Sequence, residues 1–216
     1  MSNDDLVTDV TEELYWDPKL DSGSIAVSAD NGTVTLRGAV GSFREKREAA
    51  KDARRIYGVT DVKNDLKVRL MTDAQREDAD VRADVLQSLG LDSLVPATVD
   101  AKVKDGIVTL TGTAEYQYQR DEAEFVAGNL LGVIGLTDEV ELIGPPPEAD
   151  DVKHDIKKAF KRNAKIDADD LSIETSDHTV TVKGTVSSWA EHDEAIDAAW
   201  AAPGVRDVHD RIQVIY

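Results

Sequence analysis

Two neighbouring stretches in the N-terminal part of the chain alternate between apolar and polar residues. Residues 24–29 and 33–40 follow this pattern and are rich in β-branched side chains, and Asn31-Gly32 lies between them. A period of two is typical of a half-buried strand, and Asn-Gly favours a tight hairpin turn. The pattern therefore predicts a β-hairpin.

Apolar residues at helical spacing occur before the hairpin, and a capping signal follows it. The first helix is predicted over residues 4–15 by Leu6, Val7, Val10 and Leu14. Ser42 can cap a second helix, which we expect to run to about Tyr57, with Gly58 ending it in the C′ position. A third strand is indicated by alternation, with one break in phase, at Val59, Val62, Leu66 and Val68. The order is α-β-β-α-β.

This unit occurs three times. VTLRGAV at 34–40 returns as VTLTGTA at 108–114 and VTVKGTV at 180–186, and apolar residues at helical spacing return at 79–89 and 150–160. The glycines recur at matching places, as Gly38, Gly112 and Gly184 in the strand and as Gly58, Gly132 and Gly204 before the closing tail. We therefore predict an α+β protein of three tandem domains, each a three-stranded mixed sheet with two helices packed on one face. The predicted domains are 1–70, 76–143 and 148–216, joined by linkers at 71–78 and 144–151.

The hairpin turns of the three copies differ in their residues. Asp105-Gly106 favours the same tight hairpin turn as Asn31-Gly32. Asp177-His178 is weaker turn chemistry, because histidine tolerates a positive φ less readily than glycine does. The strand glycines are expected to provide a bare backbone for close packing or a positive φ, rather than a binding loop.

The unit resembles the BON domain, named for bacterial osmotic-stress and nodulation proteins. The resemblance lies in the V-T-(L/V)-x-G-x-(V/A) strand and in the closing strand that begins with Gly58-Val59 and Gly204-Val205. The middle copy departs from the closing motif, with Leu136 at the place of the first valine. The resemblance implies a bacterial, non-enzymatic protein linked to phospholipid attachment, osmotic stress and the cell envelope. It supplies no catalytic residue.

Composition narrows the function classes. The chain has 216 residues, 43 of them acidic and 25 basic, with a formal net charge of −18 and no cysteine. This charge argues against nucleic-acid binding, and no apolar stretch is long enough to span a bilayer. If Met1 is the native start, we expect a cytoplasmic protein, because no signal peptide is present; a removed leader would make it periplasmic.

Two helices carry basic stripes that are candidates for contact with anionic lipid headgroups. The stripe of the second helix consists of Arg44, Arg47, Lys51, Arg54 and Arg55. The stripe of the first helix in the third copy consists of Lys153, Lys157, Lys158, Lys161, Arg162 and Lys165. The alternative is a solvated helix face whose cations pair with neighbouring carboxylates.

Other chemistry-bearing residues are expected to be ordinary surface groups. His154, His178, His192 and His209 fall at unrelated places in the repeats, so we predict exposed side chains and no metal site. The acidic run Asp167, Asp169 and Asp170, followed by Glu174, lacks the EF-hand pattern and is interpreted as a solvated loop. We find no nucleophile elbow and no phosphate-binding loop, and we expect neither enzyme activity nor a cofactor.

Two functions from different classes stay open. One is a stress-related protein that touches anionic phospholipid surfaces through its basic helix faces. The other is a soluble acidic scaffold or chaperone-like module that binds protein partners without membrane contact, and cation binding is a weaker third option. We expect a monomer or a weak dimer.

Overall fold

The computed structural model describes residues 2–71, 76–144, 149–164, 166–167 and 170–216. The chain forms two compact units, Met1–Thr111 with Ala123–Glu139 and Gly112–Glu122 with Val140–Tyr216. The boundary between the units runs through the second repeat. The first and third repeats each lie within one unit, so their cores can be followed in full.

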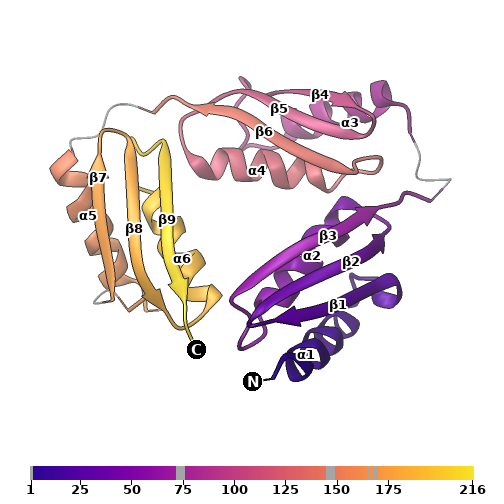
Figure 1. Cartoon of the computed structure of the whole chain (residues 1–216). Coiled ribbons are helices and arrows are strands. Elements are labelled where there is room, and N and C mark those ends of the chain that lie inside the picture. Colours follow the sequence, from indigo (N-terminus) through magenta and orange to yellow (C-terminus); the bar gives the residue numbers. More distant parts are fainter. Residues whose placement is uncertain (1, 72–75, 145–148, 165, 168–169) are drawn as a thin grey trace. The chain divides into compact units, whose positions relative to one another are not determined.

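The first repeat has the predicted order of elements (Figure 1). Its elements are α1 (Asn3–Trp16), a short 3₁₀ turn at Ser22–Ser24, β1 (Ile25–Asp30), β2 (Thr33–Val40), α2 (Phe43–Arg54) and β3 (Asp61–Val68). The sheet order is β1-β2-β3, with β1 antiparallel and β3 parallel to β2. The sheet is therefore mixed, because α2 carries the chain back so that β3 can run beside β2 in the same direction.

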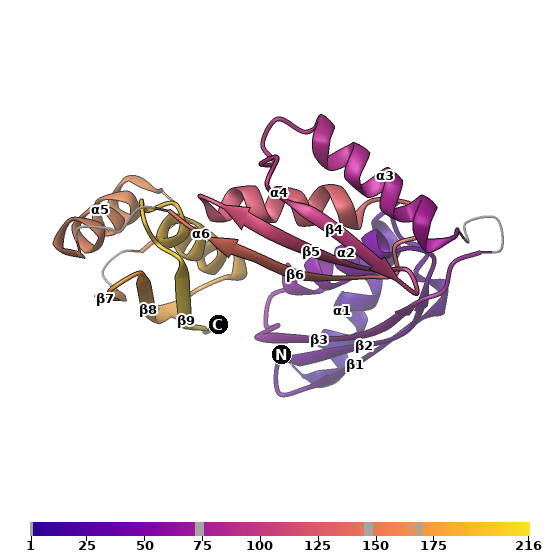
Figure 2. The same ribbon diagram turned by 90° about the horizontal axis from the view of Figure 1, so that it is seen from above.

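The second and third repeats have the same order of elements (Figures 1 and 2). The second repeat comprises α3 (Asp78–Leu91), β4 (Asp100–Lys104), β5 (Ile107–Ala114), α4 (Gln117–Gly128) and β6 (Gly135–Leu142). The third comprises α5 (Ala149–Arg162), β7 (Leu171–Ser176), β8 (Thr179–Val186), α6 (Trp189–Trp200) and β9 (Asp207–Val214). The sheet orders are β4-β5-β6 and β7-β8-β9. The predicted fold class, three tandem α+β domains with three-stranded mixed sheets, is confirmed.

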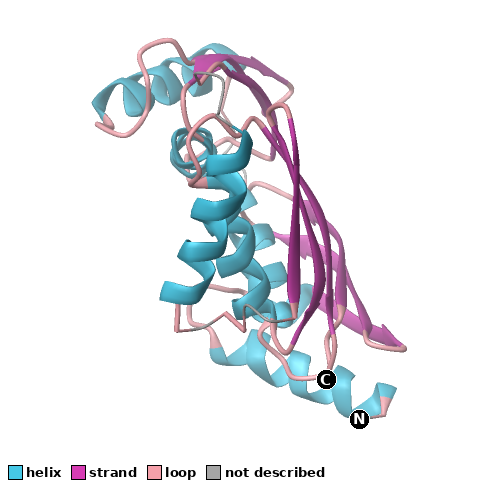
Figure 3. Ribbon diagram, turned by 90° about the vertical axis from the view of Figure 1, so that its left-hand side faces the viewer, coloured by secondary structure: helices cyan, strands magenta, loops and turns pink. Residues whose placement is uncertain are grey.

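In each repeat the helices cover one face of the sheet (Figure 3). The core of the first repeat is built from Leu6, Val10, Leu14, Val34, Leu36, Val40, Ala49, Ala53, Val59 and Leu66. Ala49 and Ala53 are fully buried on α2, and their small side chains let this helix lie close to the sheet. The third repeat uses alanines in the same places, at Ala195 and Ala199 of α6.

The hairpin turns follow the chemistry of their residues. Asn31 and Asp105 have φ of 47° and 51°, and the glycines that follow them also have positive φ. A positive φ at both central residues is the requirement of the type I′ hairpin turn. Asp177 has a φ of 51°, but His178 does not adopt a positive φ, and its Nδ1 lies 2.9 Å from the Gly204 carbonyl oxygen.

The strand glycine is required by a close backbone approach. Gly38 has a φ of +131°, and a Cβ built on it would lie 1.9 Å from the carbonyl oxygen of Ser24. Gly184 repeats this arrangement, with a φ of +143° and a distance of 2.1 Å to the Asp170 carbonyl oxygen. Gly112 has a φ of 112°. Both reasons predicted for this glycine, a positive φ and close packing, are therefore present at Gly38 and Gly184.

The second helix of the first repeat is shorter than predicted. It ends at Arg54 and not at Tyr57, so Gly58 is not its C′ residue. The backbone N–H of Arg55 donates to the Asp52 carbonyl, a tighter bond than that of an α-helix, and the chain then leaves the helix through turns. The glycine still takes a left-handed conformation in that turn, with φ of 90° at Gly58, 92° at Gly132 and 79° at Gly204.

Candidate functional site

The basic stripe of the third repeat lies on the outer face of α5. Its described members Lys153, Lys157, Lys158, Lys161 and Arg162 are all exposed. On the opposite side of the same helix, Val152, Ile156 and Phe160 are buried in the core of the repeat. Lys158 Nζ lies 3.9 Å from Asp155 Oδ1. Lys165 lies outside the described residues. The helix thus separates an apolar face from a cationic one.

The basic stripe on α2 is less accessible to a ligand than the stripe on α5. Arg44, Lys51, Arg54 and Arg55 are exposed, whereas Arg47 is half-buried. Within the same compact unit, the Arg47 guanidinium lies 5.7 Å from the centre of the Phe125 ring, a cation–π contact. Arg55 pairs with the carboxylate of Asp52 and lies 3.5 Å from that of Glu13. Because these contacts engage Arg47 and Arg55, the basic stripe on α2 is the weaker of the two candidate surfaces.

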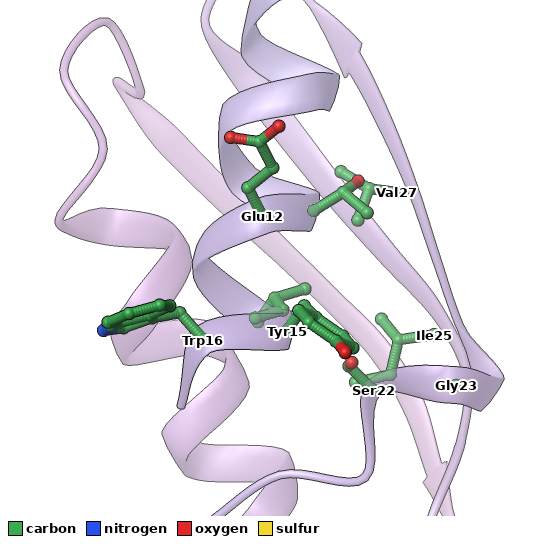
Figure 4. Close-up of a pocket in the computed structure, with 9 residues that line it drawn as sticks. Glu12, Tyr15, Trp16, Ser22, Gly23, Ile25 and Val27 are labelled. Atoms are coloured by element: carbon green, nitrogen blue, oxygen red, sulfur yellow. The ribbon is translucent and has the colours of Figure 1, made fainter. Parts of the chain in front are cut away.

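An apolar groove lies between α1 and β1 in the first repeat, and the sequence patterns did not indicate it. Its volume is about 590 Å³, and its lining includes Leu14, Tyr15, Trp16, Ile25 and Val27. Tyr15 and Trp16 are 83% and 82% exposed. Figure 4 shows the Tyr15 ring beside Ser22 and Ile25, with Trp16 directed away from them. Two adjacent aromatic residues at the end of an amphipathic helix were the available signal, because both cannot face the same core.

His192 contradicts the prediction that the histidines are exposed. It is 8% exposed, and its Nδ1 and Nε2 lie 3.0 Å from Asp193 Oδ1 and 2.8 Å from Asp210 Oδ2. Burial disfavours the charged imidazolium, but the hydrogen bonds to Asp193 and Asp210 outweigh this effect and raise the pKa of His192. His154 and His209 are exposed as predicted, and His178 is half-buried.

Three carboxylates gather in the first repeat, where the sequence patterns predict no metal site. Asp17, Glu48 and Asp52 each place one carboxylate oxygen within 4.8 Å of the others. The backbone hydrogen bond from Lys19 is the main cause that holds the pKa of Asp17 below its ordinary value, so this carboxylate is ionised at neutral pH. The acidic run considered from the sequence is different: Glu174 lies on β7 and accepts a hydrogen bond from Lys183, Asp167 and Asp170 are exposed, and Asp169 is outside the described residues.

In the described part of the chain, no helix combines the length and the apolar character needed to cross a bilayer.

Comparison with known proteins gives one curated relative, Osmotically-inducible protein Y of Escherichia coli (strain K12). The two sequences are 32% identical over 138 residues, which is 62% of this chain and 69% of that protein. Among solved structures, CdsD, a structural protein of the type III secretion system of Chlamydia trachomatis, aligns over 98% of this chain and 92% of its own. The identity is 14% and the TM-score is 0.28, so this likeness carries no argument. The PrgH periplasmic domain aligns over 89% of this chain and 95% of its own, with 9% identity and a TM-score of 0.23.

A family model settles the relationship that the sequence motifs indicated. The BON domain matches at residues 2–69, 77–144 and 149–216, which together cover nearly the whole chain. The chain therefore belongs to the BON domain family, with three copies of the domain in tandem.

Proposed function

We propose that this protein binds anionic phospholipid surfaces through the basic face of α5, and that it does so as part of a response to osmotic stress. The observation that carries the proposal is the separation of faces on α5, with five exposed cations opposite the buried Val152, Ile156 and Phe160. The stress role is supported by the name of the relative, Osmotically-inducible protein Y. The BON family is non-enzymatic in kind, and we extend this to the present chain.

The expected energies favour contact without insertion. Each Lys or Arg near an anionic membrane surface contributes about 1 kcal/mol. The five cations of α5 are exposed, whereas its large apolar side chains are committed to the core, so the helix would attach to headgroups and not enter the acyl region. The net charge of −18 opposes approach at long range, but salt screens this repulsion beyond about 8–10 Å. The local charge of α5 therefore dominates at contact.

A protein partner is the second candidate function, and the groove between α1 and β1 favours it. Tyr15 and Trp16 are amphipathic aromatic residues, a type enriched in protein interfaces, and both are largely exposed beside this groove. If a protein partner binds in this groove, the net negative charge of the chain would serve to keep it in solution, and membrane contact would not be needed.

Flotation of the purified chain with vesicles of phosphatidylcholine, with and without phosphatidylglycerol, tests the lipid proposal. We expect binding only to the anionic vesicles, and weaker binding at higher salt. Replacing Lys157, Lys158 and Lys161 with Gln removes three charges and should weaken binding by about 100-fold.

A matched control removes the same charge from another helix. Replacing Arg44, Lys51 and Arg54 of α2 with Gln changes the net charge equally, so it reproduces the long-range effect but leaves α5 intact. We expect this control to retain most of the binding. Absence of flotation with anionic vesicles at every salt concentration would exclude the lipid function and leave the groove as the functional surface.

A further inference from the structure

The carboxylates of the first repeat come from two segments that the fold brings together. Asp17 follows α1 as its C-cap residue, and Glu48 and Asp52 lie one turn apart on α2. All three are shielded from solvent, with side-chain exposures of 8%, 17% and 0%. Three carboxylates held this close repel one another and lose hydration, so they require positive charge nearby.

Two side chains of the protein supply only part of that charge. Lys19 Nζ lies 2.6 Å from Glu48 Oε1 and 3.5 Å from Asp17 Oδ2. Arg55 pairs with Oδ1 of Asp52. The other oxygen of this carboxylate, Asp52 Oδ2, is buried and has no hydrogen-bond partner among the described residues. Among the described residues, the three carboxylates thus have two cations within ion-pair distance, one of them shared with Glu13, and one buried carboxylate oxygen has no hydrogen-bond partner.

The other repeats show that the fold does not need a carboxylate at this place. The residue equivalent to Asp52 is Val126 on α4 and Ala198 on α6, and both helices form with the same length as α2. In the third repeat, Asn163 takes the place of Asp17 and its Nδ2 donates to Glu194, the equivalent of Glu48, at 2.7 Å. In the third repeat a neutral amide therefore provides a hydrogen-bond donor to the glutamate at this position. A buried carboxylate oxygen without a hydrogen-bond partner is costly. Asp52 Oδ2 is such an atom among the described residues, at a place where the other two repeats have an apolar side chain, and this indicates a ligand.

We propose that Asp17, Glu48 and Asp52 bind a Ca²⁺ ion. The donors are all carboxylate oxygens, which hard divalent cations prefer, and one oxygen from each lies within 4.8 Å of the others. Oxygens on opposite sides of Ca²⁺ lie about 4.6–5.2 Å apart, against about 4.0–4.2 Å for Mg²⁺, so the larger ion needs less rearrangement. Water completes the coordination shell, because Ca²⁺ takes about six to eight oxygens.

Lys19 acts in this proposal as a counter-ion that gives way to the cation. Its ammonium contacts two of the three ligands, and its side chain is 51% exposed, so it can swing into solvent when Ca²⁺ enters. Arg55 can stay in place, because it pairs with the Asp52 oxygen that is not the unsatisfied one. The site lies wholly within the first repeat and does not depend on the lipid-binding surface of α5.

Calorimetric titration of the full chain with CaCl₂ in a KCl buffer tests the site. A chain with a net charge of −18 binds Ca²⁺ diffusely, so the comparison between variants carries the result. We expect a specific binding event in the wild type that is lost in Asp52→Ala, the residue found at this place on α6, and in Glu48→Gln. Lys19→Gln should strengthen binding by about tenfold, at the lower end of the effect of one neighbouring charge on a binding equilibrium.

Glu194→Gln is the matched control, because it makes the Glu48→Gln change at the equivalent position of the third repeat. It should leave the specific event unchanged. Circular dichroism of each variant establishes that it is folded. Equal titrations for the wild type, Asp52→Ala and Glu48→Gln would overturn the site, and tighter binding of Mg²⁺ than of Ca²⁺ would overturn the choice of ion.

Discussion

The first and third repeats build one backbone with the same local devices. Gly38 pairs with Ile25 across the first hairpin, and Gly184 pairs with Leu171 in the same register. In each repeat a serine caps the second helix, and a glutamate in the first turn accepts a hydrogen bond from the backbone before the cap. The residues are Ser42 and Glu45 in the first repeat and Ser188 and Glu191 in the third.

The polar residues inside these two copies are different. Asp52 of α2 corresponds to Ala198 of α6, and Lys46 corresponds to His192. The polar contacts therefore lie at different positions of the fold. The first repeat has a carboxylate cluster between the end of α1 and α2, and the third has a His192–Asp210 pair between α6 and β9. The comparison teaches that glycines and apolar positions specify the shared backbone, while chemistry specific to one copy is placed at positions the backbone leaves free.

The largest effect is expected where the two repeats agree. Gly184→Ala places a Cβ 2.1 Å from the Asp170 carbonyl oxygen at a φ of +143°, so it should destabilise the third repeat by about 3 kcal/mol. In a Trp16→Phe background the remaining tryptophans, Trp189 and Trp200, both lie on α6, and their fluorescence reports urea unfolding of this repeat.

Gly90→Ala provides the control for this prediction. Gly90 lies within α3, and a Cβ there meets no atom within 4 Å, so the change should leave the fluorescence transition of α6 unmoved. A loss below about 1 kcal/mol for Gly184→Ala would contradict the close approach of Gly184 to Asp170.

A transplant of the carboxylates into the third repeat should have the next largest effect. Asn163→Asp combined with Ala198→Asp would surround Glu194 with two acidic groups, as Asp17 and Asp52 surround Glu48. Without Ca²⁺ the double variant should lose about 2 kcal/mol of stability, because the new carboxylates are desolvated and repel one another. Calorimetry should reveal a Ca²⁺-binding event that the wild-type third repeat lacks.

The single variant Asn163→Asp separates the effect of an added negative charge from the effect of a complete set of three ligands. It adds one carboxylate beside Glu194 but supplies no third ligand, so we expect no specific Ca²⁺ binding from it. If the double variant gains no binding either, three carboxylates at these positions are not sufficient for a site.

Local chemistry explains why most of the fold was predictable from the sequence. The Asn31-Gly32 turn and the strand glycine each depend on residues close in the chain or on one backbone conformation. Such requirements restrict the residue type at a single position, so they can be recognised in the sequence. The end of α2 was missed, because the i→i−3 bond from the Arg55 N–H to the Asp52 carbonyl closes the helix without any glycine or proline as a signal.

The polar sites were less predictable, because their members are distant in the chain. His192 on α6 contacts Asp210 on β9, and Asp17 meets Asp52 only after α1 and α2 pack together. No spacing rule connects such pairs in a single sequence. The basic face of α5 could be predicted because all its residues share one helix, so helical periodicity alone places them together.

The smallest expected effect concerns pH and again distinguishes the two repeats. The pKa of His192 is raised in the folded protein, because the hydrogen bonds to Asp193 and Asp210 outweigh the cost of burial. The imidazolium therefore contributes stability that is fully present below the unfolded pKa of about 6.5 and is lost as the pH rises through the higher folded pKa. For one proton the slope cannot exceed about 1.4 kcal/mol per pH unit.

Urea unfolding of the Trp16→Phe protein at a series of pH values from about 6 to about 8 measures this loss in the third repeat. The first repeat has Lys46 and Asn64 at the places of His192 and Asp210, and Asn64 Nδ2 donates to the Lys46 backbone carbonyl, so this hydrogen bond joins an amide to a carbonyl and involves no imidazole or carboxylate. The double change His192→Lys with Asp210→Asn recreates that pair and should remove the pH dependence. If the dependence persists in the double variant, it comes from groups other than the His192–Asp210 pair, and the polar difference between these repeats would have no consequence for stability near neutral pH.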